Sequence, residues 1–173
     1  MKLIKPGSLL GFVPQPNLQT TLVIYNPVTI RLCPKILGTK FVTETVYVET
    51  SIIGYLTVRS SNNLILMANR EITMDWWEKR RSQFTLYISQ VVLDEVAEGD
   101  AEIATKRLGI LRDFPLLALN LTVEDLATQF LTLSNLPPKA ANDALHIALA
   151  TVYGLDYLLT WNCKHIANRF RKN

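Results

Sequence analysis

Four polar side chains adjoin strongly apolar segments and together have the chemistry of a metal site. They are Glu49, Glu95, Asp143 and Asn162. Carboxylates that lie close together raise each other's pKa, and a hard divalent cation such as Mg²⁺ or Mn²⁺ relieves their repulsion. Such an ion suits phosphodiester hydrolysis, because it stabilises charge on the phosphoryl oxygens and activates water. We predict that Glu49, Glu95 and Asp143 bind the ion, directly or through water, and that Asn162 completes the site by a hydrogen bond.

Asp143 is the most unusual of the four residues. It lies in the first turn of a helix, predicted from near Ala140 to Gly154, that is apolar nearly all round. A helix without a polar face belongs inside a protein, where a carboxylate is costly unless it is paired, hydrogen-bonded or bound to a cation. The N-terminal helix dipole offsets only part of that cost. We therefore expect Asp143 to share a polar site with Asn162, which follows the next strand.

Each acidic residue also has a structural explanation when it is taken alone. Glu49 could cap the following helix, and Glu95 could be a solvated or ion-paired helix residue. The helix dipole could satisfy Asp143. His146, one turn from Asp143, could orient that carboxylate or be a hydrogen-bonded core histidine. The functional interpretation depends on all four polar residues lying together at one edge of the fold. Clusters of ionisable groups with perturbed pKa values are typical of active sites.

The elements that must position these residues alternate between strand and helix. Strands are predicted to begin at Thr45, Thr85, Pro115 and Tyr157. This order predicts an α/β fold with a mostly parallel sheet of four strands, or five, and helices on both faces. Right-handed crossovers bring the carboxyl ends of parallel strands to one edge, where open α/β sheets bind ligands.

The spacing of apolar residues and the capping residues predict the helices between the strands. Seven helices are predicted in chain order. The first begins at Thr50 or Ser51 as N-cap, and the others are Asn62–Arg81, Ser89 or Gln90 to Gly99, Asp100–Arg112, Thr122 as cap to about Leu133, Ala140 to Gly154, and Lys164–Lys172.

Composition indicates an ordinary globular chain. Of the 173 residues 49% are hydrophobic and 19% are charged, and the net charge of +3 is compatible with a polyanionic partner without requiring one. The two cysteines lack metal-site spacing, so a reducing cytoplasm is expected, and the two histidines nearly exclude a zinc site of several His and Cys ligands. No apolar run approaches the ~20 residues of a membrane span.

The first 44 residues differ from the rest, because they hold five of the eight prolines. We expect residues 1–44 to be a loosely ordered extension and residues 45–173 to be the folded domain. Short strands at Thr20–Tyr25 and Val28–Leu32 are the alternative for the extension.

Four segments in combination resemble the PIN-domain family, and within it the VapC-like ribonuclease toxins. They are VYVETSIIGYL, SQVVLDEVAEG, ANDALHIALA and DYLLTWNCKHIAN. The resemblance covers roughly Thr45 to Asn168. It implies a three-layer α/β/α fold and a Mg²⁺- or Mn²⁺-dependent endoribonuclease, the toxin of a type II toxin–antitoxin pair, with RNA as substrate and a cognate antitoxin protein as partner. A homodimer is an open alternative for its assembly.

Carried over by position, the resemblance implies the same site as the residue types do. The first three acids of the family fall on Glu49, Glu95 and Asp143, and the fourth polar position falls on Asn162. Small hydroxyl residues that support the first acid match Thr50 and Ser51. Contacts to substrate are expected from Thr50, Ser51, Lys164 and His165.

Three features depart from the family pattern. The first acid is Glu49, where most of the family has Asp, and the first 44 residues have no counterpart. The chain also ends soon after Asn162, where the family usually adds a strand, so a sheet edge is expected to be open. These features favour an alternative, an inactive PIN scaffold that binds RNA or a protein. A third hypothesis is a receiver-like phosphoacceptor domain, with Lys164 near the last strand.

Overall fold

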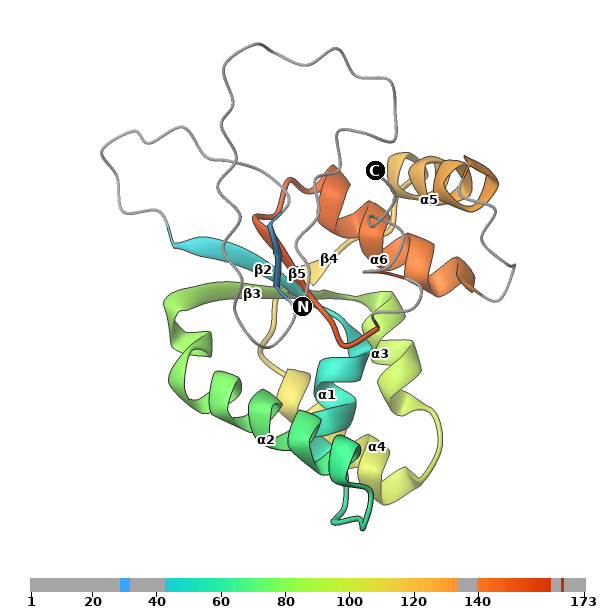
Figure 1. Cartoon of the computed structure of the whole chain (residues 1–173). Helices are drawn as coiled ribbons and strands as arrows, with labels where there is room; N and C mark the ends of the chain where they lie inside the picture. Colours follow the sequence, from blue (N-terminus) through green and yellow to red (C-terminus); the bar gives the residue numbers. More distant parts are fainter. Residues whose placement is uncertain (1–28, 32–42, 134–139, 163–165, 167–173) are drawn as a thin grey trace.

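The computed structural model describes residues 29–31, 43–133, 140–162 and 166. Within these residues, strands and helices alternate over most of the chain (Figure 1). The elements are β1 (Thr29–Arg31), β2 (Glu44–Val48), α1 (Thr50–Thr57), α2 (Leu64–Lys79), the 3₁₀ helix η2 (Arg81–Gln83), β3 (Phe84–Ser89), α3 (Gln90–Ala97), α4 (Ala101–Leu111), β4 (Leu116–Leu117), α5 (Leu121–Leu133), α6 (Ala141–Val152) and β5 (Tyr157–Leu159).

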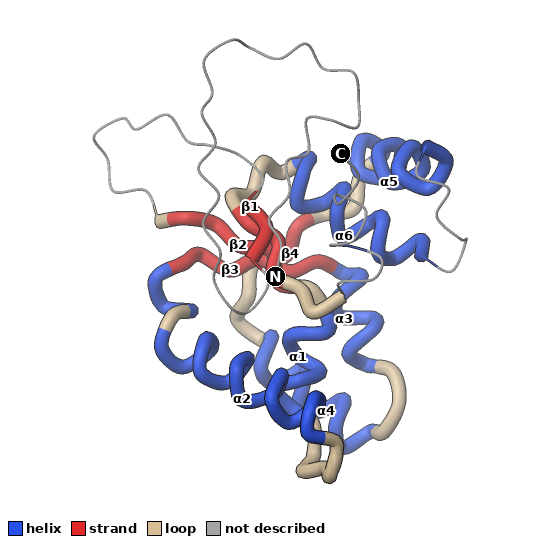
Figure 2. The backbone as a smooth tube through the Cα atoms, in the orientation of Figure 1, coloured by secondary structure: helices blue, strands red, loops and turns tan. Residues whose placement is uncertain are grey.

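The five described strands form one sheet in the order β1-β5-β2-β3-β4. Strands β2, β3, β4 and β5 are parallel, and β1 is an antiparallel strand at the edge. Helices α5 and α6 lie above the sheet in Figure 1, whereas α1, α2 and α4 lie below it. The predicted α/β fold with a mostly parallel sheet between two helical layers is confirmed (Figure 2). The described part of the sheet has five strands.

Strand β2 runs through the centre of the sheet and of the hydrophobic core. Its residues Val46, Tyr47 and Val48 are fully buried, as expected for a parallel strand that is covered by helices on both faces. Strand β2 pairs with β3 on one side and with β5 on the other, Val48 lying opposite Leu159. The carboxyl ends of β2 and β5 are therefore side by side, and the residues that follow them come together.

Strand β1 covers the edge of the sheet that was expected to be open. It pairs with β5 in antiparallel register, with Thr29 opposite Leu159 and Arg31 opposite Tyr157. Part of the proline-rich extension therefore joins the sheet within the expected segment Val28–Leu32. The suggested strand Thr20–Tyr25 lies outside the described residues. The sequence alone could not indicate this pairing, because a short strand carries no information about its partner.

Several predicted element ends differ from those observed. The strand predicted from Pro115 to Leu119 is the shorter β4, because Asn120 already serves the next helix: its side chain accepts a 3.0 Å hydrogen bond from the Val123 N–H. The prediction that Thr122 caps that helix was therefore wrong. Helix α2 begins after Asn63, whose side chain caps it. Asp100 likewise caps α4 instead of lying within it.

Candidate metal site at the carboxyl edge of the sheet

Glu49 directly follows β2, is 5% exposed and is the N-cap of α1. Its Oε1 accepts a 3.1 Å hydrogen bond from the Ser51 N–H, and its Oε2 accepts hydrogen bonds from the Ser51 hydroxyl and, at 2.6 Å, from the Thr160 hydroxyl. The prediction of Thr50 or Ser51 as the cap was wrong, because the longer glutamate side chain folds back over its own helix start. Its carboxylate is thus held between β2, α1 and β5.

Glu95 reaches the same edge from α3. Its Oε1 accepts a 2.8 Å hydrogen bond from the Asn142 side chain. Its Oε2 accepts one from the Thr50 hydroxyl and lies 3.1 Å from Nε2 of His146. Asn142 and His146 lie one turn apart on α6, so one face of that helix holds the carboxylate. Thr50 was expected to support the first acid, Glu49, but it donates to the second acid instead.

The surroundings of Glu95 keep it ionised. Burial is the largest single influence and acts to raise its pKa, but the hydrogen bonds from His146, Thr50 and Asn142 act together in the opposite direction. The net effect lowers the pKa of Glu95 from 4.5 to about 2. The carboxylate therefore carries its negative charge at neutral pH and is available to a cation.

This lowered pKa predicts an acid-sensitive contribution to stability. Because the folded-state pKa lies below the unfolded value, the contribution is complete above a pH of 4.5 and is lost as the pH falls toward 2. At about 1.4 kcal/mol per pKa unit, it amounts to about 3 kcal/mol. Between about pH 7 and about pH 3, wild type should lose about 2 kcal/mol more unfolding free energy in urea than Glu95→Gln. Parallel curves for the two proteins would show that folding does not lower this pKa.

His146 completes a group of three potential metal ligands. One ligand atom each from Glu49, Glu95 and His146 lies within 4.8 Å of the other two, so within the described residues this group could hold a metal ion. His146 was expected to orient Asp143 or to be a core histidine; it is 1% exposed and contacts Glu95. One feature of the sequence could have indicated these contacts to Glu95. The four-residue spacing of Asn142 and His146 places both donors on one face of the helix.

Asp143 and Asn162 form a hydrogen-bonded pair beside this group. The Asn162 amide donates to Oδ1 of Asp143 at 2.6 Å. The Asn162 backbone N–H donates at 2.8 Å to the Thr160 hydroxyl, which in turn donates to Glu49. Asp143 is not one of the three residues within 4.8 Å of one another. It lies next to Asn142, the partner of Glu95, and so reaches the same edge of the sheet.

The remaining predicted site residues divide into two pairs. Ser51 holds Glu49 through its N–H and hydroxyl, and its Oγ also accepts a 2.8 Å hydrogen bond from the Trp161 N–H. Thr50 holds Glu95. Lys164 and His165, expected to contact substrate, lie outside the described residues.

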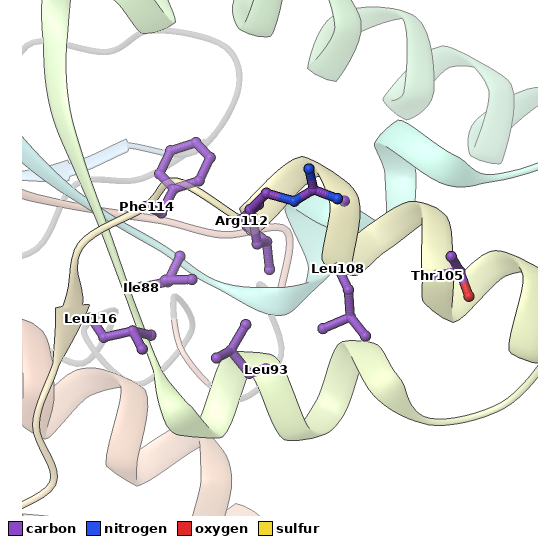
Figure 3. Close-up of a pocket in the computed structure, with 9 residues that line it drawn as sticks. Ile88, Leu93, Thr105, Leu108, Arg112, Phe114 and Leu116 are labelled. Atoms are coloured by element: carbon purple, nitrogen blue, oxygen red, sulfur yellow. The ribbon is translucent and has the colours of Figure 1, made fainter.

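An apolar cavity of about 410 Å³ lies away from these carboxylates, between the β3–β4 side of the sheet and helices α3 and α4 (Figure 3). Its lining includes Ile88, Leu93, Leu108, Phe114 and Leu116, and the close-up shows Leu93 and Leu108 pointing toward each other from α3 and α4. None of the predicted site residues that the structure describes lines it. Its walls lack acidic side chains, so it does not offer the chemistry of the site formed by Glu49 and Glu95.

No model of a protein family, no curated protein and no solved structure matched this chain. In the part of the chain that the structure describes, no helix combines the length and the apolar character needed to cross a membrane.

Proposed function

We propose that this chain is a metal-dependent endoribonuclease that hydrolyses RNA phosphodiester bonds, and that it is the toxin of a toxin–antitoxin pair with a cognate antitoxin protein as partner. One observation supports the catalytic part. A carboxylate oxygen of Glu49 lies within 4.8 Å of a carboxylate oxygen of Glu95, although the two residues come from different elements. Support for the biological part comes from the four segments that resemble the VapC-like toxins.

The donor atoms of the site fit Mg²⁺ or Mn²⁺. A carboxylate can accept about four hydrogen bonds, and each of the two glutamates accepts three within the described part of the chain. Counting only these described contacts, one lone pair of each carboxylate could accept a cation. Hard ions of this kind prefer oxygen ligands and retain several waters, which suits a half-buried site at the edge of a sheet. Asp143 would take part through such a water.

The side chains around the site would act by fixing the positions of the two negatively charged carboxylates. Ser51 and Thr160 orient Glu49, while Thr50, Asn142 and His146 orient Glu95. A bound divalent ion would supply stabilisation of phosphoryl charge and an activated water. Preorganised donors of this kind need no rearrangement when substrate arrives. The Asn162 amide would keep Asp143 turned toward the site.

RNA incubated with the purified protein and Mn²⁺ tests the proposal. Wild type should cleave the RNA, EDTA should abolish cleavage, and Asp143→Asn should slow it about 100-fold because the site loses a negative charge. Asp125→Asn, a change at an exposed carboxylate on α5, is the matched control and should cleave like wild type. Equal cleavage in all four samples would show that the activity is a contaminant and would refute the proposal.

An inactive scaffold that binds RNA or a protein is the second candidate. It is favoured by the structural work that Glu49 already performs, since its carboxylate caps α1 and accepts a hydrogen bond from the strand-end residue Thr160. Melting temperature separates the two candidates, because an ion that binds only the folded state raises it. A rise with Mn²⁺ supports the nuclease, whereas retained RNA affinity without any rise supports the scaffold.

A further inference from the structure

A chain of polar side chains leads from Glu95 into the core. From Glu95 Oε2 it passes to Nε2 of His146 at 3.1 Å, from Nδ1 of His146 to the Tyr47 hydroxyl at 2.8 Å, and from that hydroxyl to the Ser89 Oγ at 2.7 Å. His146, Tyr47 and Ser89 are all buried. Buried polar groups are costly unless they are hydrogen-bonded, so each link of this chain constrains its neighbours.

We propose that His146 is a positioning residue for Glu95, and that Tyr47 and Ser89 hold its ring so that a hydrogen on Nε2 points at the Glu95 carboxylate. The role of Glu95 as a metal ligand rests on the proposed function. The direction of the hydrogen bond from His146 to Glu95 does not, because it follows from their 3.1 Å contact and from the ionised state of Glu95.

The contact with Glu95 determines where one proton of the ring lies. An ionised carboxylate can only accept, so Nε2 of His146 carries a hydrogen and donates it to Glu95. On the other side of the ring, the Tyr47 hydroxyl lies 2.8 Å from Nδ1 and is itself hydrogen-bonded to the Ser89 hydroxyl at 2.7 Å. Burial raises the pKa of Tyr47, so its phenol keeps its proton.

The same arrangement indicates that His146 orients a ligand and is not itself one. A metal-binding nitrogen must be bare, and Nε2, the nitrogen that contacts Glu95, carries the hydrogen. Tyr47 and Ser89 lie on β2 and β3, so the sheet aligns the ring, and the ring aligns Glu95. Groups that orient metal ligands in this way typically contribute about 10- to 100-fold to metal affinity.

Nitrogen–proton correlation spectra of the histidine rings test the hydrogen-bond chain in the full-length protein. The chain has two histidines, so His165→Gln identifies the signals of His146. We expect Nε2 to be protonated, without Mg²⁺ and with it. Tyr47→Phe should shift the Nε2 signal, because the ring loses the hydroxyl that holds Nδ1, and Tyr55→Phe, which removes another hydrogen-bonded hydroxyl, should not. A bare Nε2, whether from the outset or on adding Mg²⁺, would overturn the proposal.

Melting temperatures across a Mn²⁺ titration test the effect on Glu95. His146→Leu should raise the Mn²⁺ concentration for half-maximal stabilisation about 10- to 100-fold, and His146→Gln, whose amide can still donate, should recover much of it. A purely structural role would lower the melting temperature of both variants without moving that concentration, and this result would overturn the proposal. If wild type neither responds to Mn²⁺ nor cleaves RNA, the proposed function fails, and the ring spectra still decide between the positions of the proton.

Discussion

Replacing Glu95 by glutamine is expected to slow Mn²⁺-dependent RNA cleavage about a thousandfold. The substitution keeps the size of the side chain and leaves an oxygen that can accept from His146 or Thr50, but it removes the negative charge. Glu95 is the acid whose environment most clearly maintains that charge, since its pKa is lowered to about 2. A metal site that loses one of its anionic ligands loses both affinity for the ion and the charge that fixes its position.

The measurement is the initial cleavage rate of a labelled RNA at several Mn²⁺ concentrations. Asp94→Asn is the matched control: Asp94 is the preceding residue on α3, and its exposed carboxylate accepts a 2.7 Å hydrogen bond from Gln90. It should retain the wild-type rate. High Mn²⁺ should restore part of the Glu95→Gln rate, because the weakened site still has Glu49. If the two variants cleave alike with unchanged melting temperatures, Glu95 has no part in catalysis and the site must lie elsewhere.

Replacing Asp156 by alanine is expected to lower the free energy of unfolding by about 3 kcal/mol. Asp156 is fully buried just before β5. Its Oδ2 accepts hydrogen bonds from both the backbone N–H and the hydroxyl of Thr45 on β2, each at 2.8 Å, and the Asp156 N–H donates to that hydroxyl at 3.0 Å. Alanine removes the carboxylate from both donors and leaves a buried void beside them.

Urea unfolding at neutral pH measures this loss, and the melting temperature should fall by roughly 10 °C for a chain of this size. Thr45→Val, which retains the branched shape and removes only the hydroxyl, should cost about 1 kcal/mol. Asp113→Ala, at an exposed position, should change stability by less than about 0.5 kcal/mol. A loss for Asp156→Ala no larger than that of Asp113→Ala would mean that this contact does not hold β5 to β2.

This contact also matters for the site at the opposite ends of the two strands. Asp156 and Thr45 fix the start of β5 against the start of β2, and Glu49 and Asn162 follow the ends of the same strands. Asp156→Ala is therefore expected to loosen the hydrogen bond between Thr160 and Glu49 as well.

The local order of strands and helices could be predicted from the sequence because it depends on neighbouring residues. Apolar runs placed β2, β3 and β5 within a residue of their observed starts. Glycine marked two helix ends correctly: Gly99 and Gly154 follow α3 and α6 with φ of 89° and 60°, a backbone region that glycine enters without strain. The parallel topology followed from the alternation, and it correctly implied that Glu49 and Glu95 would approach each other.

The partners of each site residue were decided by the tertiary structure. Thr50 was assigned to the acid next to it, yet it donates to Glu95, 45 positions away. His146 was expected either to orient Asp143, one turn along its own helix, or to be a hydrogen-bonded core histidine; it is buried, and its partner at the site is Glu95, 51 positions away. Periodicity reports which residues share a face, but not which other element faces them. The facing element depends on the strand order and on how α1, α3 and α6 pack at one edge of the sheet. Each of these helices could be predicted alone, but the site exists only where the three meet.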